Sequence, residues 1–174
     1  MVARYRTYGS RAGQPAHWSY FREAVARRAG VAPAGRDAVH EYLIGQANLR
    51  GFHGAFSTRE ELGVVDASLD LEDIIVGLLQ PHAPAEPRIL KLVLRILQAP
   101  SIDPSRLWLR ARRERADAVL AWLIAMVPEA ERTESFDGIE REMAARPPRG
   151  TRTPDIVYDP TRLQRRPGLR RRPE

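Results

Sequence analysis

Residues 86–98 read EPRILKLVLRILQ and are the most strongly patterned segment of the chain. After the first turn, the polar positions follow one another at intervals of three, four and three residues: Arg88, Lys91, Arg95 and Gln98. Everything else from 89 to 97 is aliphatic, so only one narrow stripe of an α-helix over this segment can face water. A helix with so wide an apolar surface packs on several sides. We therefore predict that it lies at the centre of a helical bundle.

Helical signals also fill most of the chain before this segment. We predict helices over about residues 15–30, 37–51, 57–62 and 68–80. Asp37 is the expected N-cap of the second of these helices, and Gly51 its C-terminal stop. The fourth is expected to begin at Ser68, a residue type that suits an N-cap. Its first turn then holds three acids, which the helix dipole favours there: Asp70, Glu72 and Asp73.

Further helices are predicted after the opening segment. Asp103-Pro104 gives N-cap and first-turn signals for a helix that extends to about Val127, with a break around residues 112–115. The second half of this helix has no charged residue after Asp117, so it is either deeply buried or covered by a partner. A last helix places three apolar residues on one face: Phe136, Ile139 and Met143.

These patterns predict an all-α protein with one folded domain. We expect residues 15–145 to form a compact bundle of about six to eight helices. Residues 1–14 are expected to form a flexible basic and aromatic arm. Residues 146–174 contain six prolines and too few apolar side chains to offset the entropy cost of ordering, so an unstructured basic tail is predicted there. The alternative is a solenoid-like stack of helix pairs, because two helix endings before proline recur 18 residues apart.

The net charge of the chain is concentrated in this tail. The 174 residues include 28 Lys or Arg and 22 Asp or Glu, which gives a formal net charge of +6. Residues 1–67 carry +3, residues 68–143 carry −3 and residues 144–174 carry +6. All basic residues except Lys91 are arginine, whose planar guanidinium can contact a phosphate at two points. The sequence thus indicates an anionic partner for the tail.

Several kinds of functional site are missing from the sequence. There is no cysteine, and the four histidines lie far apart, so we expect neither a metal site nor any other cofactor. Neither a phosphate-binding glycine loop nor a Gly-x-Ser-x-Gly motif occurs. The neighbouring acids Glu72 and Asp73 point in different directions on a helix, which argues against a paired acid and base. We predict that the protein is not an enzyme.

Two other classes are also disfavoured by the sequence. A helix-turn-helix over residues 58–80 would present the acids of the last predicted helix of that range to DNA, which would repel phosphate. No uncharged stretch reaches the roughly 18 residues of a membrane-spanning helix, and no signal peptide is evident at the N-terminus. We therefore predict a cytoplasmic protein that does not bind membranes.

Arginine clusters are the main functional signal. The candidates for polyanion binding lie at the end of the tail: Arg162, Arg165, Arg166, Arg170, Arg171 and Arg172. Two secondary basic rows are expected on helices: Arg106, Arg110 and Arg113 in one, and Arg88, Lys91 and Arg95 in the other. The first row is expected to be a solvated face. Pairs of Arg113 with Asp117 and of Arg110 with Glu114 would neutralise part of it.

Four apolar or aromatic residues are candidates for contact with a partner: Ile156, Val157, Tyr158 and Trp122. The first three form an island in the tail that either folds onto a partner or docks back on its own domain. We predict a non-catalytic interaction or regulatory protein whose tail binds nucleic acid or another polyanion. The alternative is a protein-complex subunit or antitoxin-like inhibitor. It would bind an acidic protein surface, another protein or a second copy of itself through an apolar helix and the tail, without nucleic acid.

Overall fold

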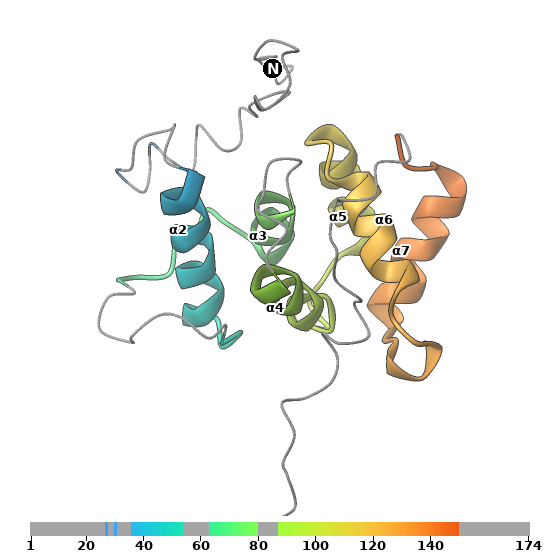
Figure 1. Cartoon of the computed structure of the whole chain (residues 1–174), viewed down its shortest axis with the longest axis horizontal. Coiled ribbons are helices and arrows are strands. Elements are labelled where there is room, and N and C mark those ends of the chain that lie inside the picture. The colour runs from blue at the N-terminus through green and yellow to red at the C-terminus, as the bar shows by residue number, and fades with distance from the viewer. Residues whose placement is uncertain (1–26, 28–29, 31–35, 54–62, 80–86, 150–174) are drawn as a thin grey trace, which may run out of the picture.

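The computed structural model of the chain describes Arg27, Gly30 and residues 36–53, 63–79 and 87–149 (Figure 1). Within those ranges it contains six α-helices, one 3-10 helix and no strand. The elements are α2 (Arg36–Leu49), α3 (Leu71–Leu78), α4 (Pro87–Leu97), α5 (Pro104–Arg113), α6 (Asp117–Ala125), the 3-10 helix Glu129–Glu131 and α7 (Glu134–Ala145). The all-α prediction is therefore confirmed for this part of the chain. The helix expected over 57–62, nearly all of the one over 15–30, the N-terminal arm and the tail from residue 150 lie outside the described residues.

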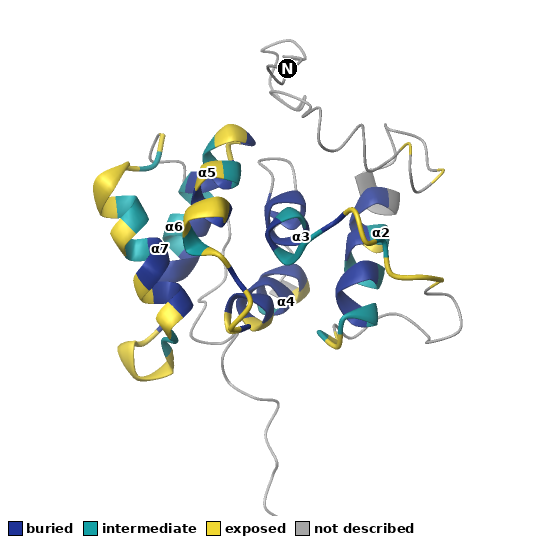
Figure 2. Ribbon diagram, turned by 180° about the vertical axis from the view of Figure 1, so that it is seen from behind, coloured by how far each residue is buried: buried dark blue, intermediate teal, exposed yellow. Residues whose placement is uncertain are grey.

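The helices share one hydrophobic core. Helix α3 contacts α2, α4 and α5, while α5 also contacts α6 and α7, which contact each other. Buried apolar side chains form a continuous cluster from Val39 on α2 to Ile139 on α7. Figure 2 shows the buried faces turned toward neighbouring helices. The two largest fully buried side chains are Trp108 of α5 and Phe136 of α7, so the contact between these two helices holds much of the core.

Helix α4 has the narrow polar stripe that its sequence predicts. Seven aliphatic side chains between residues 89 and 97 are buried: Ile89, Leu90, Leu92, Val93, Leu94, Ile96 and Leu97. Three of the predicted stripe residues, Arg88, Arg95 and Gln98, are exposed, and Lys91 is half-buried. The apolar face predicted for the last helix is also confirmed, because Phe136 and Ile139 of α7 are fully buried.

The start of α3 differs from its prediction. Its N-cap is Asp70, whose carboxylate accepts the backbone N–H of Asp73 at 2.8 Å, so the prediction of a start at Ser68 is wrong. Ser68 is instead held in the turn before the helix, where its backbone N–H donates to Oδ1 of Asp66 at 2.9 Å. Both residues are good caps, and the carboxylate of Asp66 makes the difference because it engages Ser68 in a turn of its own.

Helix α2 begins one residue before the predicted cap and ends as expected. Its first residue is Arg36, so Asp37 lies inside the helix and is not its N-cap. At the other end Gly51 has φ +90°, a conformation that glycine adopts without steric cost. The backbone N–H of Phe52 donates to the carbonyl of Ala47 at 3.0 Å, and that of Gly51 to the carbonyl of Asn48 at 2.9 Å. This pair of bonds is the Schellman helix ending.

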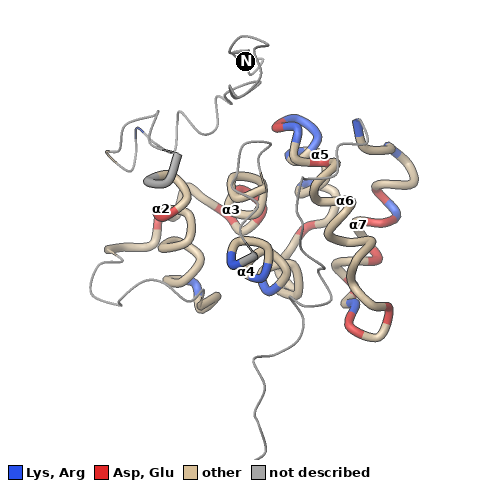
Figure 3. The backbone as a smooth tube through the Cα atoms, in the orientation of Figure 1, with Lys and Arg blue, Asp and Glu red and all other residues tan. Residues whose placement is uncertain are grey.

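The break expected near residues 112–115 separates α5 from α6. Arg115 has φ +58°, a left-handed conformation that is uncommon outside glycine. The backbone N–H of the next residue, Ala116, donates to the carbonyl of Ala111 at 2.8 Å, which closes the end of α5. The turn brings α6 back against α5 and leaves a cluster of arginines at the end of α5 (Figure 3).

Candidate anion-binding site

Helix α5 carries the densest group of arginines in the described part of the chain. Its N-cap is Asp103, whose carboxylate accepts the backbone N–H of Arg106 at 3.1 Å, and Pro104 occupies its first turn. The last turn holds three arginines: Arg110, Arg112 and Arg113. Cations are favoured at this end of a helix because its unpaired carbonyls carry partial negative charge. The arginines of α5 face two different surroundings: the acids of α3, and a hollow whose described lining residues include no acid.

The first group faces α3 and is neutralised by it. The guanidinium of Arg110 lies 2.7 Å from the carboxylate of Asp73 and also pairs with Asp70. Arg106 pairs with Asp70 as well. The side chain of Arg110 is only 26% exposed, so the prediction that this row is a solvated face is wrong at this residue. Asp70 and Asp73 take the place of the expected partner Glu114, because the packing of α5 on α3 brings their carboxylates to Arg110.

The two carboxylates at the start of α3 have different pKa values. Burial and the neighbouring charge of Asp70 raise the pKa of Asp73 to about 6. Burial also acts to raise the pKa of Asp70. The hydrogen bond from the Asp73 backbone and the charges of Arg110 and Arg106 outweigh that effect and hold the Asp70 pKa below its usual 3.8.

We therefore expect Asp73 to make stability depend on pH. The folded state holds this proton more tightly than the unfolded chain, so its contribution is complete below about pH 4 and is lost as pH rises through 6. The variant Asp73→Asn stays neutral and should lack this loss. Relative to the variant, the wild type should lose about 1 kcal/mol between pH 4.5 and 7.5, a figure reduced for solvent screening. Urea unfolding followed by circular dichroism at both pH values measures this difference. Parallel pH curves for the two proteins would contradict it.

Two other acids of the core bind backbone N–H groups. Glu72 is buried and accepts the backbone N–H of Asp103 at 2.8 Å, ahead of α5. It points away from Asp73, which pairs with Arg110, so the predicted divergence of these two neighbours is confirmed. Asp117, buried at the start of α6, accepts the backbone N–H of Arg149 at 2.7 Å. The ion pair of Arg113 is with Glu114 and not with the expected Asp117.

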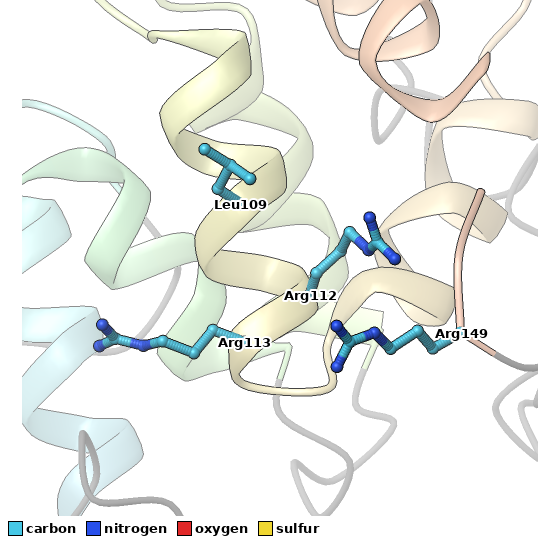
Figure 4. A pocket seen from close by; sticks show the side chains of 4 residues that line it. All are labelled: Leu109, Arg112, Arg113 and Arg149. Atoms are coloured by element: carbon cyan, nitrogen blue, oxygen red, sulfur yellow. The ribbon is translucent and has the colours of Figure 1, made fainter. Parts of the chain in front are cut away.

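The bond to Asp117 places Arg149 beside the second group of arginines. A surface hollow of about 220 Å³ is lined by four residues: Leu109, Arg112, Arg113 and Arg149 (Figure 4). Three are cationic, and none of the described residues that line the hollow is acidic. Arg113 keeps one contact, from its Nε to Oε1 of the buried Glu114 at 3.4 Å. The hollow thus presents positive charge that the described residues neutralise only in part.

Two hydrogen bonds fix the segment after α7, and this segment forms the side of the hollow opposite α5. The indole Nε1 of Trp108 donates to the carbonyl of Arg146 at 2.9 Å, three residues before Arg149. The N–H of Arg149 is the other fixed point. Because both bonds use the backbone of residues 146–149, the side chain of Arg149 is left to face the solvent. Sequence reasoning does not identify Arg112 and Arg149 as one site. The available signal is Asp117, a lone acid at the start of an apolar helix.

The remaining candidate residues are spread over the chain. On α4, Arg95 donates to the carbonyl of His53, an exposed loop residue, while Arg88 and Lys91 lie elsewhere on the same stripe. Trp122 of α6 is half-buried against the core. The tail arginines and the three tail residues Ile156, Val157 and Tyr158 lie outside the described residues.

Comparisons with known proteins add no assignment. No protein-family model, no curated protein and no solved structure matches the chain. Among the residues that the structure describes, no group of three or more histidine, aspartate or glutamate side chains is arranged to hold a metal ion. No helix within those ranges is long and apolar enough to cross a bilayer.

Proposed function

We propose that the chain is a compact helical bundle with an unstructured basic tail, and that it acts without catalysis as a nucleic-acid-binding regulatory or interaction protein. In this proposal, the six arginines at the end of the tail bind the phosphates of a nucleic acid or another polyanion. The surface around Arg149, where the tail leaves the described part of the chain, supports that binding.

The observation that carries this proposal is the sorting of charge on the folded part. Arg106 and Arg110 are neutralised by acids of α3, whereas the described residues that line the hollow beside Arg149 include no acid. Figure 3 shows basic residues both at the end of α5 and after α7. Residues 150–174 continue from this point with seven arginines and three acids. A polyanion bound by the tail would therefore lie beside a basic surface, and not an acidic one, where the tail joins the described part of the chain.

The tail is tested in the full-length protein. Replacing the six distal arginines with glutamine removes six charges that the fold does not use in this proposal: Arg162, Arg165, Arg166, Arg170, Arg171 and Arg172. We expect the affinity for a fluorescein-labelled DNA duplex to fall at least about tenfold and the dependence of binding on salt to become shallower. Fluorescence anisotropy at several salt concentrations measures both. The far-ultraviolet circular dichroism should be unchanged. A variant that binds as the wild type does would remove the tail from the proposal.

A second function, binding of a protein through α6, is supported by a separate observation. Four apolar residues of this helix are only half-buried: Ala118, Val119, Ala121 and Trp122. Removing such side chains from water is the main source of affinity in protein interfaces. If this surface is used, purified protein should form a dimer or retain a second chain in light scattering, and Trp122→Ala should abolish that species. A strict monomer that co-purifies with no other chain would argue against it.

A further inference from the structure

We infer that the hollow formed by Leu109, Arg112, Arg113 and Arg149 is a site for one backbone phosphate of a nucleic acid. Arg112 and Arg149 would contact the phosphate oxygens, and Leu109 would pack against the attached sugar. This inference rests on the proposed function and deepens it. It adds to the tail a fixed contact on the folded part of the protein, which would set where the bound strand lies.

The charges at the hollow favour an anion. Arg112 and Arg149 come from segments far apart in sequence, α5 and the chain after α7, yet both line the same hollow. Figure 4 shows their side chains entering from these two sides, whereas Arg113 extends away from them. Each of these two guanidinium groups is positively charged and can only donate hydrogen bonds. Placing two such charges at one hollow, with no acid among its described lining residues, costs energy that a bound anion would offset.

Arg112 has one side-chain donor that the fold does not satisfy. Its Nε is shielded from solvent and has no hydrogen-bond partner in the structure. The arginines with a structural role behave differently: Arg110 pairs with two carboxylates, and Arg132 pairs with Glu140 at 2.6 Å while donating to the carbonyl of Val127 at 3.0 Å. Arg112 therefore differs from Arg110 and Arg132, because the fold leaves its Nε without a hydrogen-bond partner.

The second arginine is positioned without using its side chain. The backbone N–H of Arg149 is bound by Asp117, which is 1% exposed, and Trp108 holds the carbonyl of Arg146. These two bonds fix the direction of the chain at the hollow. The guanidinium of Arg149 is thus presented at a defined place, as binding by positioned groups requires. Replacing the Arg149 side chain should leave intact the two hydrogen bonds that fix the segment.

The dimensions of the hollow suit a small part of a larger ligand. Its volume of about 220 Å³ is below the roughly 300–1,000 Å³ of clefts that enclose small-molecule ligands. One exposed apolar wall, Leu109 at 49% exposure, lies beside the arginines. A phosphate joined to a sugar matches this combination of charge and apolar surface. The arginines of the tail, which continues from residue 150, would then reach the neighbouring phosphates of the same strand.

The test compares full-length Arg112→Gln, Arg149→Gln and the double variant with Arg141→Gln. Arg141 is an exposed arginine of α7 that does not line the hollow, so its variant controls for loss of one charge. With a fluorescein-labelled DNA duplex, the double variant should bind about tenfold more weakly. The slope of log affinity against log salt should fall by about one for each arginine that contacts a phosphate. Arg141→Gln should keep the wild-type affinity and slope within a factor of about two.

The outcomes separate this inference from the proposed function. If the wild type binds DNA and the double variant matches Arg141→Gln, the hollow is not a phosphate site and the tail remains as the binding element. If the wild type does not bind DNA at all, the proposed function itself is wrong. Polyglutamate that binds as tightly as DNA, with the same loss in the double variant, would overturn the choice of nucleic acid. If Arg112→Gln lowers the thermal midpoint, the DNA affinity of Arg149→Gln alone decides whether the hollow is a phosphate site. The side chain of Arg149 makes none of the bonds that fix the segment.

Discussion

Replacing Trp108 with alanine should destabilise the protein by about 3–5 kcal/mol, which is a large part of the roughly 5–15 kcal/mol that stabilises a typical domain. The indole lies at 0% exposure on α5, inside the core that joins all six described helices. Its removal leaves a cavity that the packed helices around it cannot close. The substitution also removes the Nε1–H donor from the carbonyl of Arg146. Urea unfolding followed by circular dichroism should show a much lower midpoint.

The variant Trp108→Phe separates the two contributions. Phenylalanine keeps an aromatic ring in the core but cannot donate to Arg146, so we expect a smaller loss of about 1–3 kcal/mol. A wild-type midpoint for Trp108→Ala would contradict the assignment of this residue to the core. Equal losses in both variants would mean that the hydrogen bond to Arg146, and not the volume of the ring, accounts for the effect.

The elements that could be predicted are those whose pattern is local. The polar stripe of α4 and the apolar face of α7 follow from helical spacing alone, and burial matches both. The break between α5 and α6 was also predictable, because Arg112 to Arg115 interrupt the apolar periodicity on either side. The exact first residue of α3 could not be predicted from the sequence. Ser68 and Asp70 are both suitable caps, and the choice depends on how Asp66 organises the turn before them.

The ion pairs and the hollow that the sequence does not predict depend on contacts between distant segments of the chain. The spacing rule for neighbours on one helix predicts that Arg110 forms an ion pair with Glu114, four residues further along the chain. The structure pairs Arg110 with Asp73, 37 positions earlier in the chain, because α3 packs against α5. The hollow has the same origin, since Arg112 and Arg149 meet only through the return of the chain after α7. Charge composition makes arginine the candidate residue type for binding an anion, but it does not predict which arginines share a site. The six tail arginines and the tail island stay predictions.

Replacing Gly138 with alanine should destabilise the protein by about 1–3 kcal/mol, the cost typical of overpacking a well-packed core. In an exposed helix the same change would stabilise by about 0.5–1 kcal/mol, because glycine has more conformational freedom to lose on folding. Gly138 lies in α7 and is buried where that helix crosses the start of α5. A Cβ atom at this position would lie 2.5 Å from Cγ and 2.9 Å from Cβ of Pro104. The proline ring is stiff and sits in the first turn of α5, so relief requires the two helices to move apart.

A double-mutant cycle with Pro104→Ala tests this cause directly. Pro104→Ala alone should cost less than about 1 kcal/mol, since it removes a favourable first-turn residue while leaving the N-cap Asp103 in place. If the ring causes the clash, Gly138→Ala should cost much less in the Pro104→Ala background, and the two changes should fail to add by about 1–2 kcal/mol. Urea unfolding of the four proteins gives this coupling. If the two changes are strictly additive, or if Gly138→Ala raises the unfolding midpoint, the explanation is wrong. The helices α5 and α7 would then lie further apart at Gly138 and Pro104 than it requires.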